Sequence, residues 1–171
     1  MNLLKDVPPG TEEEMNLVIE IPKGCQNKYE YDKKHKMFAL DRVLYSPFHY
    51  PADYGFIPGT LCEDGDPLDG FLLINEKTFP GILVKARPLG MVEMVDGGEQ
   101  DNKLICVAVD DPYHQDFKDI KDLPEHFLKS LKHFLEHYKD LQGKKVSVTA
   151  MKGVAEAKKE FNRSIKNLKQ S

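Results

Sequence analysis

Three aspartates lie within one six-residue stretch, Asp64-Gly65-Asp66-Pro67-Leu68-Asp69, which is the part of the chain richest in chemistry. Two carboxylates about 4 Å apart repel each other by about 4 kcal/mol at an effective dielectric constant of about 20. A fold that gathers three of them therefore needs a compensating cation. The donors are all oxygens, which indicates a hard ion such as Mg²⁺, Mn²⁺ or Ca²⁺ rather than zinc. Gly65 and Pro67 restrict the backbone to a tight turn, so the stretch predicts a preformed metal site.

The same stretch also has a simpler interpretation. Asp-Gly and Asp-Pro are common loop dipeptides, so a solvated turn is the alternative when the stretch is taken alone. An EF-hand loop is excluded, because no Glu stands at the twelfth position that such a loop requires. The metal interpretation therefore depends on what the rest of the chain provides.

A second pair of acids, Asp96 and Asp101, is separated by Gly97-Gly98-Glu99-Gln100 and lies between two apolar segments. Both acids are expected at one end of a barrel formed by these strands. Lys103, shortly after Asp101, should point in the same direction along its strand. Acids and a lysine that converge there suit a metal-bound anion, whereas a polar hairpin turn is the alternative for this segment alone.

Lysine, arginine and tyrosine side chains that could bind phosphate oxygens are spread over the chain. Arg42 lies inside an apolar segment, where an unpaired guanidinium group is costly, so it requires an anionic partner. Lys28 shares a strand face with Glu30, and a solvent-exposed ion pair is the alternative for these two residues. Core packing is the alternative for the tyrosines among the remaining donors, which are Tyr50, Tyr54, Tyr138 and Lys139.

The elements that must position these residues change character along the chain. Short apolar segments, broken by Gly, Pro or charged turns, predict strands in the first two thirds. Many short strands with turns between them favour a closed or partly closed antiparallel barrel. The predicted strands are Leu17–Ile21, Lys28–Asp32, Met37–Tyr45, Phe71–Ile74, Ile82–Arg87, Gly90–Val95 and Lys103–Val109.

The last third of the chain has a helical period. Apolar residues recur every three or four positions from Leu123 to Leu141, with Pro124 at the start and Gly143 beyond the end, which predicts an amphipathic helix. A strand at Val146–Met151 and a second amphipathic helix follow. The predicted fold class is therefore α+β, a small barrel with two packed C-terminal helices.

Length and composition describe a soluble globular protein. The 171 residues are 40% hydrophobic and 30% charged, and no linker or repeat divides them, so residues 1–171 are expected to form a single domain. A net charge of −4 gives no general attraction to nucleic acid or to anionic membranes. Three widely spaced cysteines, Cys25, Cys62 and Cys106, indicate buried, reduced thiols in a cytoplasmic protein. No segment resembles a signal peptide or is apolar for long enough to cross a bilayer.

Together these residues supply at least five acids for several divalent ions, and Lys, Arg and Tyr donors for phosphate oxygens. A glycine-rich phosphate-binding loop is absent from the sequence, which argues against an NTPase. The reaction that fits is metal-assisted attack of water on a phosphate, in which the ions lower the pKa of the water and neutralise the developing charge.

Two other functions stay open from the residues alone. A barrel can bind single-stranded nucleic acid on a basic, aromatic face, although uncompensated carboxylates and the negative net charge oppose this. A calcium-binding interaction protein would use the acids but would leave Lys28, Arg42 and Lys103 without a purpose. Release of free phosphate, measured with Mg²⁺ and then with a chelator, separates the three.

The chain closely resembles the first family of soluble inorganic pyrophosphatases, in its compact prokaryote-type form. The six-residue acid stretch matches the family signature. The resemblance implies a five-stranded barrel of the oligonucleotide/oligosaccharide-binding type with helices outside, and a Mg²⁺-dependent inorganic diphosphatase that hydrolyses pyrophosphate to two orthophosphates. It also implies a homohexamer. The other matching segments follow in order: Val18–Pro22, Lys28–Glu30, Asp41-Arg42, Tyr50-Pro51, Tyr54-Gly55, Asp96–Lys103 and His137–Lys139.

The resemblance further implies a role for each site residue. Asp64, Asp69 and Asp101 would ligate a first ion, and Asp69 would bridge to a second. Asp96 and Asp101 would hold further metal that arrives with the substrate, so that several Mg²⁺ ions, or Mn²⁺ and other divalent ions as substitutes, would share the site. Asp66 would accept the proton of the attacking water. The phosphoryl groups would be bound by Lys28, Arg42, Tyr54, Lys103, Tyr138 and Lys139. The supporting residues would be Glu20, Glu30 and Tyr50.

Overall fold

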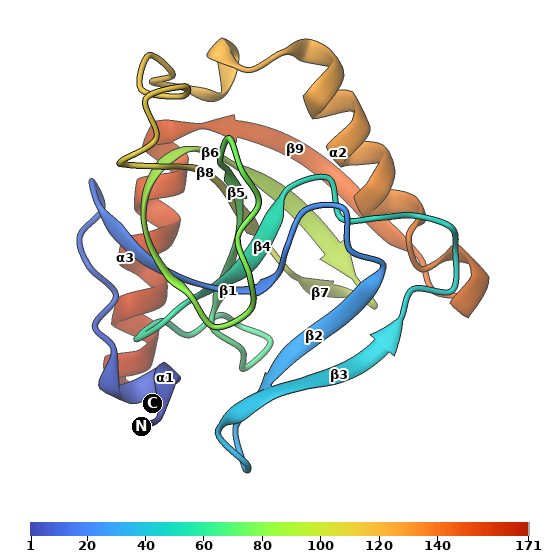
Figure 1. Cartoon of the computed structure of the whole chain (residues 1–171), viewed down its shortest axis with the longest axis horizontal. Helices are drawn as coiled ribbons and strands as arrows, with labels where there is room; N and C mark the ends of the chain where they lie inside the picture. Colours follow the sequence, from blue (N-terminus) through green and yellow to red (C-terminus); the bar gives the residue numbers. More distant parts are fainter. Residues whose placement is uncertain (171) are drawn as a thin grey trace.

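Five strands close into a ring in the computed structural model, which describes residues 1–170 (Figure 1). Each strand pairs with the next, and β1 pairs back with β6 to complete the ring. Four of these pairings are antiparallel, as expected for the barrel, and one, between β5 and β8, is parallel. In order around the ring, the strands are β1 (Met15–Ile21), β4 (Asp53–Ile57), β5 (Leu68–Leu73), β8 (Lys103–Ala108) and β6 (Leu83–Asp96).

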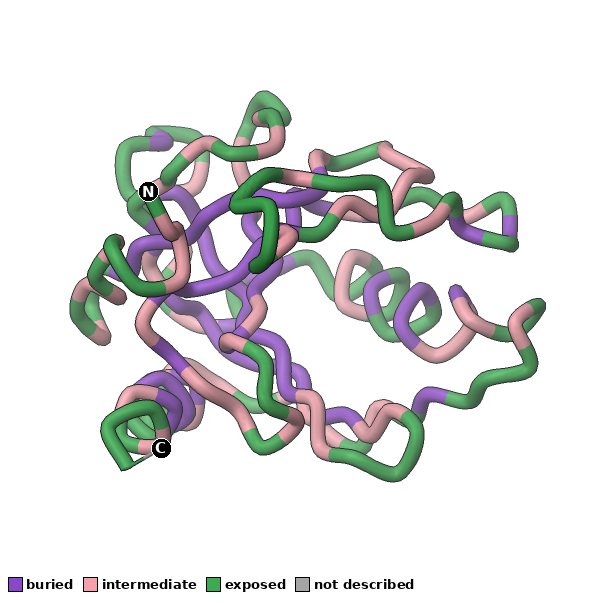
Figure 2. Tube along the Cα trace, turned by 90° about the horizontal axis from the view of Figure 1, so that it is seen from below, coloured by how far each residue is buried: buried purple, intermediate pink, exposed green. Residues whose placement is uncertain are grey.

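Strand β1 is buried along its whole length, although its sequence alternates only in part. Leu17 and Ile19 pack in the hydrophobic cluster that also contains Phe161 from the C-terminal helix. Val18, which points to the opposite side, packs with Tyr31 and with Phe56 of β4. Both faces of this strand are therefore covered. In Figure 2 the buried residues lie mainly in the inner part of the trace, and the exposed residues lie mainly at its periphery.

A separate two-stranded sheet, β2 (Asn27–Asp32) and β3 (Met37–Val43), projects from the ring. Both strands were predicted. Their register places Lys28 opposite Arg42, next to a register shift between Lys28 and Tyr29. The hairpin therefore carries two of the predicted phosphate-binding cations side by side at its base, close to the ring.

Strand β4 is not among the strands predicted from the sequence. All five of its residues are buried, and it pairs with β1 and β5. Gly55 explains how this is possible. A Cβ atom at this position would lie 1.9 Å from the carbonyl oxygen of Val18, so only glycine allows the two backbones to approach.

Strand β6 joins two segments that were predicted as separate strands. It is 14 residues long and pairs in turn with β1, β8, β9 and the short β7 (Glu99–Gln100). The register shifts between Pro88 and Gly90, where proline has no N–H to donate to a neighbour. The break that the sequence suggested is therefore a bulge within one continuous strand.

Both C-terminal helices are present. Helix α2 (Glu125–His137) begins after Pro124, and Tyr138 caps its C-terminal end. Strand β9 (Val146–Gly153) adds to β6 outside the ring, and helix α3 (Val154–Gln170) packs against β6 and β9. None of the helices in residues 1–170 is both long and apolar enough to cross a membrane. The remaining short elements are α1 (Leu3–Asp6), η1 (Ile120–Asp122) and η2 (Asp140–Gln142).

Candidate active site

One cavity, with a volume of about 290 Å³, collects most of the predicted site residues. Its wall is formed by the ends of β5, β6 and β8, the turn before β5, strand β2 of the hairpin and the end of α2. All but three of the fourteen predicted residues line it, and Glu20, Arg42 and Tyr50 are the exceptions. The lining residues are Lys28, Glu30, Tyr54, Asp64, Asp66, Asp69, Asp96, Glu99, Asp101, Lys103, Tyr138 and Lys139.

Lys103 lies at the centre of the site, with only 7% of its side chain exposed. Its Nζ lies 2.7 Å from Asp69 Oδ2 and 2.6 Å from Asp101 Oδ1. The parallel pairing of β5 with β8 places Lys103 directly opposite Asp69. Burial by itself would lower the pKa of Lys103, but the two carboxylates outweigh it and raise that pKa well above its usual range. Lys103 is therefore a fixed positive charge between two acids.

Asp69 also accepts a hydrogen bond from the Tyr54 hydroxyl at 2.5 Å. Tyr54 is 8% exposed, and burial, together with Asp69, raises its pKa well above the usual range. The phenol therefore stays protonated and is a hydrogen-bond donor. Asp69 thus receives one neutral and one charged donor, which orients its carboxylate at the first residues of β5.

The turn before β5 is closed by its own backbone. Cys62 N donates to Asp66 O at 2.8 Å, Gly65 N donates to Cys62 O at 3.1 Å, and Asp66 N donates to Asp64 Oδ1 at 3.0 Å. Gly65 has φ +85°, in the left-handed region. Burial raises the pKa of Asp64, because the charged carboxylate loses contact with water. This is the preformed turn that the sequence predicted.

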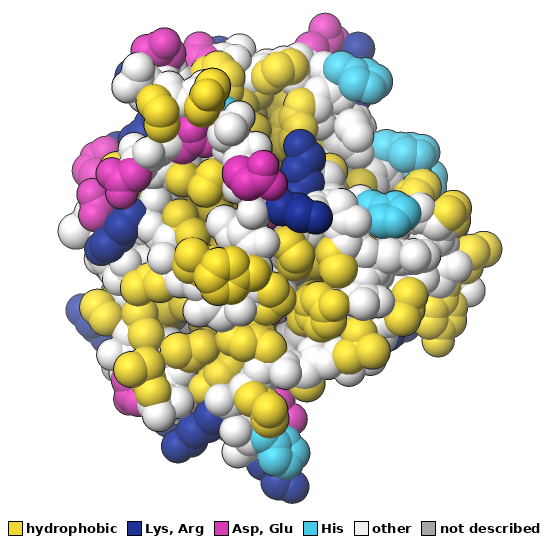
Figure 3. Space-filling model, in the orientation of Figure 1, with side chains coloured by type: hydrophobic (Ala, Val, Ile, Leu, Met, Phe, Trp, Pro, Cys, Tyr) yellow, Lys and Arg dark blue, Asp and Glu magenta, His cyan; other side chains and the backbone are white. Residues whose placement is uncertain are grey.

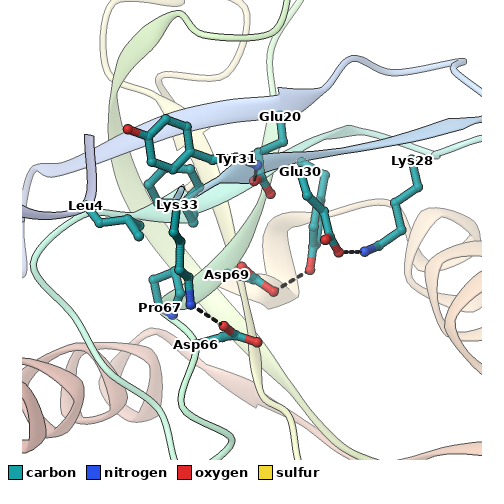
Figure 4. Close-up of a pocket in the computed structure, with 11 residues that line it drawn as sticks. Leu4, Glu20, Lys28, Glu30, Tyr31, Lys33, Asp66, Pro67 and Asp69 are labelled. Atoms are coloured by element: carbon teal, nitrogen blue, oxygen red, sulfur yellow. Dashed lines mark hydrogen bonds and ion pairs between the residues drawn. The ribbon is translucent and has the colours of Figure 1, made fainter. Parts of the chain in front are cut away.

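Asp66 points away from that turn to the β2–β3 hairpin. Its Oδ1 lies 2.8 Å from Lys33 Nζ, and both side chains are more than half exposed (Figure 4). Asp96 and Asp101 line the cavity from the end of β6 and from the segment before β8. Asp96, at the end of β6, is paired with Lys139, and Asp101 N donates to Met94 O at 2.9 Å.

The hairpin contributes a second group of charges. Lys28 is paired with Glu30, and its Nζ lies 3.4 Å from Asp41 Oδ2. Burial lowers the pKa of Lys28, with partial compensation by Asp41. Arg42 is paired with Asp41, so its anionic partner is the residue before it in the sequence. Arg42 itself does not line the cavity.

Two predicted supporting residues lie behind the cavity wall. Tyr50 is 3% exposed, and its ring lies 5.5 Å from that of Tyr54 and 5.0 Å from that of Phe134. Glu20 lines a smaller adjoining cavity of about 130 Å³ (Figure 4) and accepts a hydrogen bond from Tyr31 N at 2.7 Å. Burial, reinforced by Asp69, raises the pKa of Glu20 to about 8.

The chemistry of the donors fits hard divalent ions, because Asp64, Asp69, Asp96 and Asp101 present only carboxylate oxygens to the cavity. Burial raises the pKa of both Asp64 and Asp101, so a cation beside them stabilises their charged form. Within residues 1–170, no three Asp, Glu, His or Cys side chains are arranged to hold an ion as they stand. Lys103 and Lys139 instead contact three of these four carboxylates.

Sequence reasoning missed two residues at the site. Glu99 lines the cavity beside Asp96 and Asp101, but the sequence suggested only a spacer between those acids. Lys33 reaches Asp66 from a turn 33 residues earlier in the chain. Only the position of Glu99 between two candidate ligands was a usable signal, and nothing in the spacing of Lys33 indicated its partner.

A cavity lined by carboxylates, lysines and tyrosines at the end of a strand ring defines a metal-dependent enzyme that acts on phosphate groups. The model of the family described as inorganic pyrophosphatase matches residues 17–169. An inorganic pyrophosphatase of Picrophilus torridus is 44% identical over 171 residues, which cover 99% of this chain and 97% of the relative. Another, of Halalkalibacterium halodurans, is 52% identical over 141 residues, with 82% and 86% covered.

Solved structures agree with these sequence comparisons. The crystal structure of inorganic pyrophosphatase from Thermus thermophilus matches with a TM-score of 0.95 and 41% identity, and the match covers 99% of each chain. The chain belongs to the inorganic pyrophosphatase family, in its soluble, prokaryote-type first family. The resemblance stated from the sequence and the predicted fold class are both confirmed.

Proposed function

We propose that the cavity around Lys103 is where this chain performs the reaction of its family, the hydrolysis of inorganic pyrophosphate to two orthophosphates. The chain is an inorganic diphosphatase by its family membership, and its dependence on divalent metal follows from the same membership. The observation that carries the location is the contact of Lys103 with Asp69 and Asp101, in a cavity that also contains the turn of Asp64 and Asp66.

The main physical problem of the reaction is charge, because the substrate is a polyanion and the cavity contains many carboxylates. In our proposal the phosphoryl groups are bound by six ammonium, guanidinium and phenol donors. Bound substrate is thereby held in one orientation for attack at phosphorus. These donors are Lys28, Arg42, Tyr54, Lys103, Tyr138 and Lys139, and Glu20, Glu30 and Tyr50 support them.

Several Mg²⁺ ions would be held by Asp64, Asp69, Asp96 and Asp101, with Mn²⁺ or other divalent ions as possible substitutes. When bound, such ions supply Lewis acidity, which lowers the pKa of water and neutralises charge on the phosphate oxygens. Lys103 donates to both Asp69 and Asp101, and in our proposal its ammonium group also binds the phosphate.

Asp66 is proposed as the base. Its side chain is 63% exposed and lines the cavity, so it is open to a water molecule there. Asp66 takes the proton as the water oxygen forms its bond to phosphorus, and the bond from that phosphorus to the bridging oxygen breaks. The departing orthophosphate takes up the electron pair, and the nearby ammonium groups stabilise it.

The assembly and location of the protein are part of the proposal. We expect residues 1–171 to act as one domain, in a cytoplasmic homohexamer with no nucleic-acid or membrane partner. Exposed apolar side chains such as Phe79 (62%) and Tyr113 (74%) support contacts between subunits. Much of the surface in Figure 3 is hydrophobic. Sedimentation analysis of the purified chain tests this, and a monomer at micromolar concentration would contradict it.

The test of the site is phosphate release by Asp66→Asn. We expect turnover to fall by about 10²- to 10⁴-fold, because the amide cannot accept the proton. Binding of Mg²⁺ to the variant should stay close to that of the unmodified chain. Asp110→Asn, in an exposed turn away from the cavity, is the matched control and should retain full activity. Full turnover in Asp66→Asn would refute the role of this residue, and phosphate release that persists in excess chelator would refute the need for metal.

A further inference from the structure

The C-terminal half of α3 holds the loop that leads into Asp64. Leu61 N donates to Ser164 O at 2.9 Å, and the side-chain amide of Asn167 donates to Leu61 O at 3.2 Å. Arg163 Nη1 then lies 2.7 Å from Glu63 Oε1. The residue directly before Asp64 is therefore attached to a helix that otherwise contributes nothing to the cavity.

Arg163 is itself held in place. Its Nε and Nη2 donate to the two carboxylate oxygens of Glu160, at 3.1 and 2.8 Å, one turn earlier on the same helix. Only 9% of the Glu160 side chain is exposed. A two-pronged Arg–carboxylate pair on a buried acid fixes the plane of the guanidinium group. The guanidinium group that contacts Glu63 is thus already held in one orientation by Glu160.

A second cavity, of about 480 Å³, lies beside this arginine and shares no lining residue with the cavity around Lys103. It is lined by Arg163, Glu160 and Glu63, and also by Gln100 and Asn102, which flank Asp101. Gln100 Nε2 donates to Asn102 Oδ1 at 2.6 Å. The same cavity thus touches the sequence neighbours of two proposed metal ligands, on two different loops.

We propose that Arg163 is a positioning residue for metal binding. By holding Glu63 against the rigid Glu160 pair, it fixes the backbone at Asp64 and with it the separation between Asp64 and Asp101. The inference rests on the proposed assignment of these two aspartates as metal ligands. Removal of groups that hydrogen-bond directly to metal ligands typically lowers metal affinity by about 10- to 100-fold, and a contact at the residue next to a ligand should act at the lower end of that range.

Three variants test the inference. Glu63→Ala removes the contact with the loop and leaves the Arg163–Glu160 pair intact. Arg163→Met removes the contacts with both Glu63 and Glu160. Arg163→Lys keeps the positive charge but lacks the guanidinium group that makes the two-pronged pair with Glu160. Lys158→Met is the matched control, because Lys158 is a cation on the same helix. Its partner is Glu13, and neither residue lines the cavity around Lys103.

The measurements are calorimetric titration of the substrate-free chains with Mg²⁺ and hydrogen exchange of the amides at 61–66. We expect Mg²⁺ to bind about tenfold more weakly to Glu63→Ala and to Arg163→Met, with faster exchange in the loop. Arg163→Lys should recover part of the affinity, and Lys158→Met should match the unmodified chain. If Arg163→Met does not fold, Glu63→Ala decides the question.

Unchanged Mg²⁺ affinity and unchanged exchange in Glu63→Ala would overturn the inference. Asp64→Asn separates this failure from a failure of the site itself. If Asp64→Asn loses Mg²⁺ affinity while Glu63→Ala does not, the ligand assignment stands and only the role of Arg163 is wrong. If Asp64→Asn binds Mg²⁺ as the unmodified chain does, the ligand assignment is wrong, and the inference fails with it.

Discussion

Lys103 partly compensates the negative charge of the carboxylates in the cavity. It is a buried ammonium group in contact with two carboxylates, and its pKa is raised well above the usual range by Asp69 and Asp101, against the effect of burial. The two carboxylates therefore hold the group in its charged ammonium form. It compensates one of the two negative charges, and in our proposal a metal ion compensates the other.

Replacement of Lys103 by methionine should lower kcat/KM by about 10²- to 10³-fold, because a fixed charge at the reacting phosphate is lost. Steady-state phosphate release at saturating Mg²⁺ measures this. Lys85→Met is the control, since Lys85 is a half-exposed lysine of β6 whose partner, Glu14, lies outside the cavity. A loss of similar size in both variants would show that the effect does not depend on the site.

The raised pKa of Glu20 makes the free energy of unfolding depend on pH. Its pKa is about 8 in the folded chain and 4.5 in a model peptide, because it is buried. Between these values the folded chain keeps a proton that the unfolded chain has released. The contribution of Glu20 to the free energy of unfolding therefore falls as pH rises through this window, by at most about 1.4 kcal/mol per pH unit.

Glu20→Gln should remove this loss, since the amide stays neutral and its oxygen can still accept the hydrogen bond from Tyr31 N. The stability gained over the unmodified chain should grow from about pH 5 to about pH 8. Urea denaturation in the presence of a chelator measures it at each pH. Glu125→Gln, at an exposed position of α2, is the control and should show no such trend. A gain that is independent of pH would contradict the raised pKa.

At the scale of the elements, the close approach of β1 and β4 depends on Gly55. A Cβ there would lie 1.9 Å from Val18 O and 2.8 Å from Ile19 Cα, which are backbone atoms that cannot move aside cheaply. Gly55→Ala should therefore reduce the free energy of unfolding by about 3 kcal/mol or more. Gly70→Ala on the adjacent strand is the control, because its nearest contacts would be ordinary ones at 3.6 Å. Thermal denaturation compares the two variants, and equal melting temperatures would show that the ring can absorb the methyl group.

Most elements were predictable, because their apolar period or their Pro and Gly boundaries are local signals. Strand β4 was not, since Tyr54 and Gly55 follow Pro51 in a segment with few branched residues, and its strand conformation depends on neighbours distant in the sequence. The break at Pro88 was local and misleading, because β6 accommodates it as a bulge. Both differences have one cause, which is that the ring, and not the segment, decides the local conformation.

The site was predictable to the extent that its residues were tied to motifs. The turn of Asp64 to Asp69 and the acids around Asp101 lie in the same cavity, as the sequence suggested. The partners of these acids were harder to predict from the sequence. Lys33 contacts Asp66, and Arg163 contacts Glu63 from 100 residues away, and neither distance in sequence follows any period.

Cys25 and Cys62 are half-buried and only Cys106 is buried, whereas the sequence predicted three buried thiols.

At the scale of the whole molecule, metal binding and stability should be coupled. Ions that bind the folded chain alone stabilise it by about 2.7 kcal/mol at 100 times their dissociation constant. Mg²⁺ should therefore raise the melting temperature by several degrees, and a chelator should reverse this. Differential scanning calorimetry measures the shift. Sodium chloride of equal ionic strength controls for screening, and Asp69→Asn should lose most of the effect. A shift that sodium chloride reproduces in full would count against specific sites.

The parallel pairing of β5 with β8 sets a condition on how activity emerges during folding. Asp69 and Lys103 are opposite each other in this pairing, although 34 residues and the whole of β6 separate them. Displacement by one residue would turn Lys103 to the other face of the sheet and leave two acids without their counter-charge. Contacts of such long range form slowly. Catalytic activity therefore requires the correct strand topology. A chain whose helices have formed but whose barrel is still open has no active site. After denaturation, turnover should recover later than the circular dichroism signal of the helices.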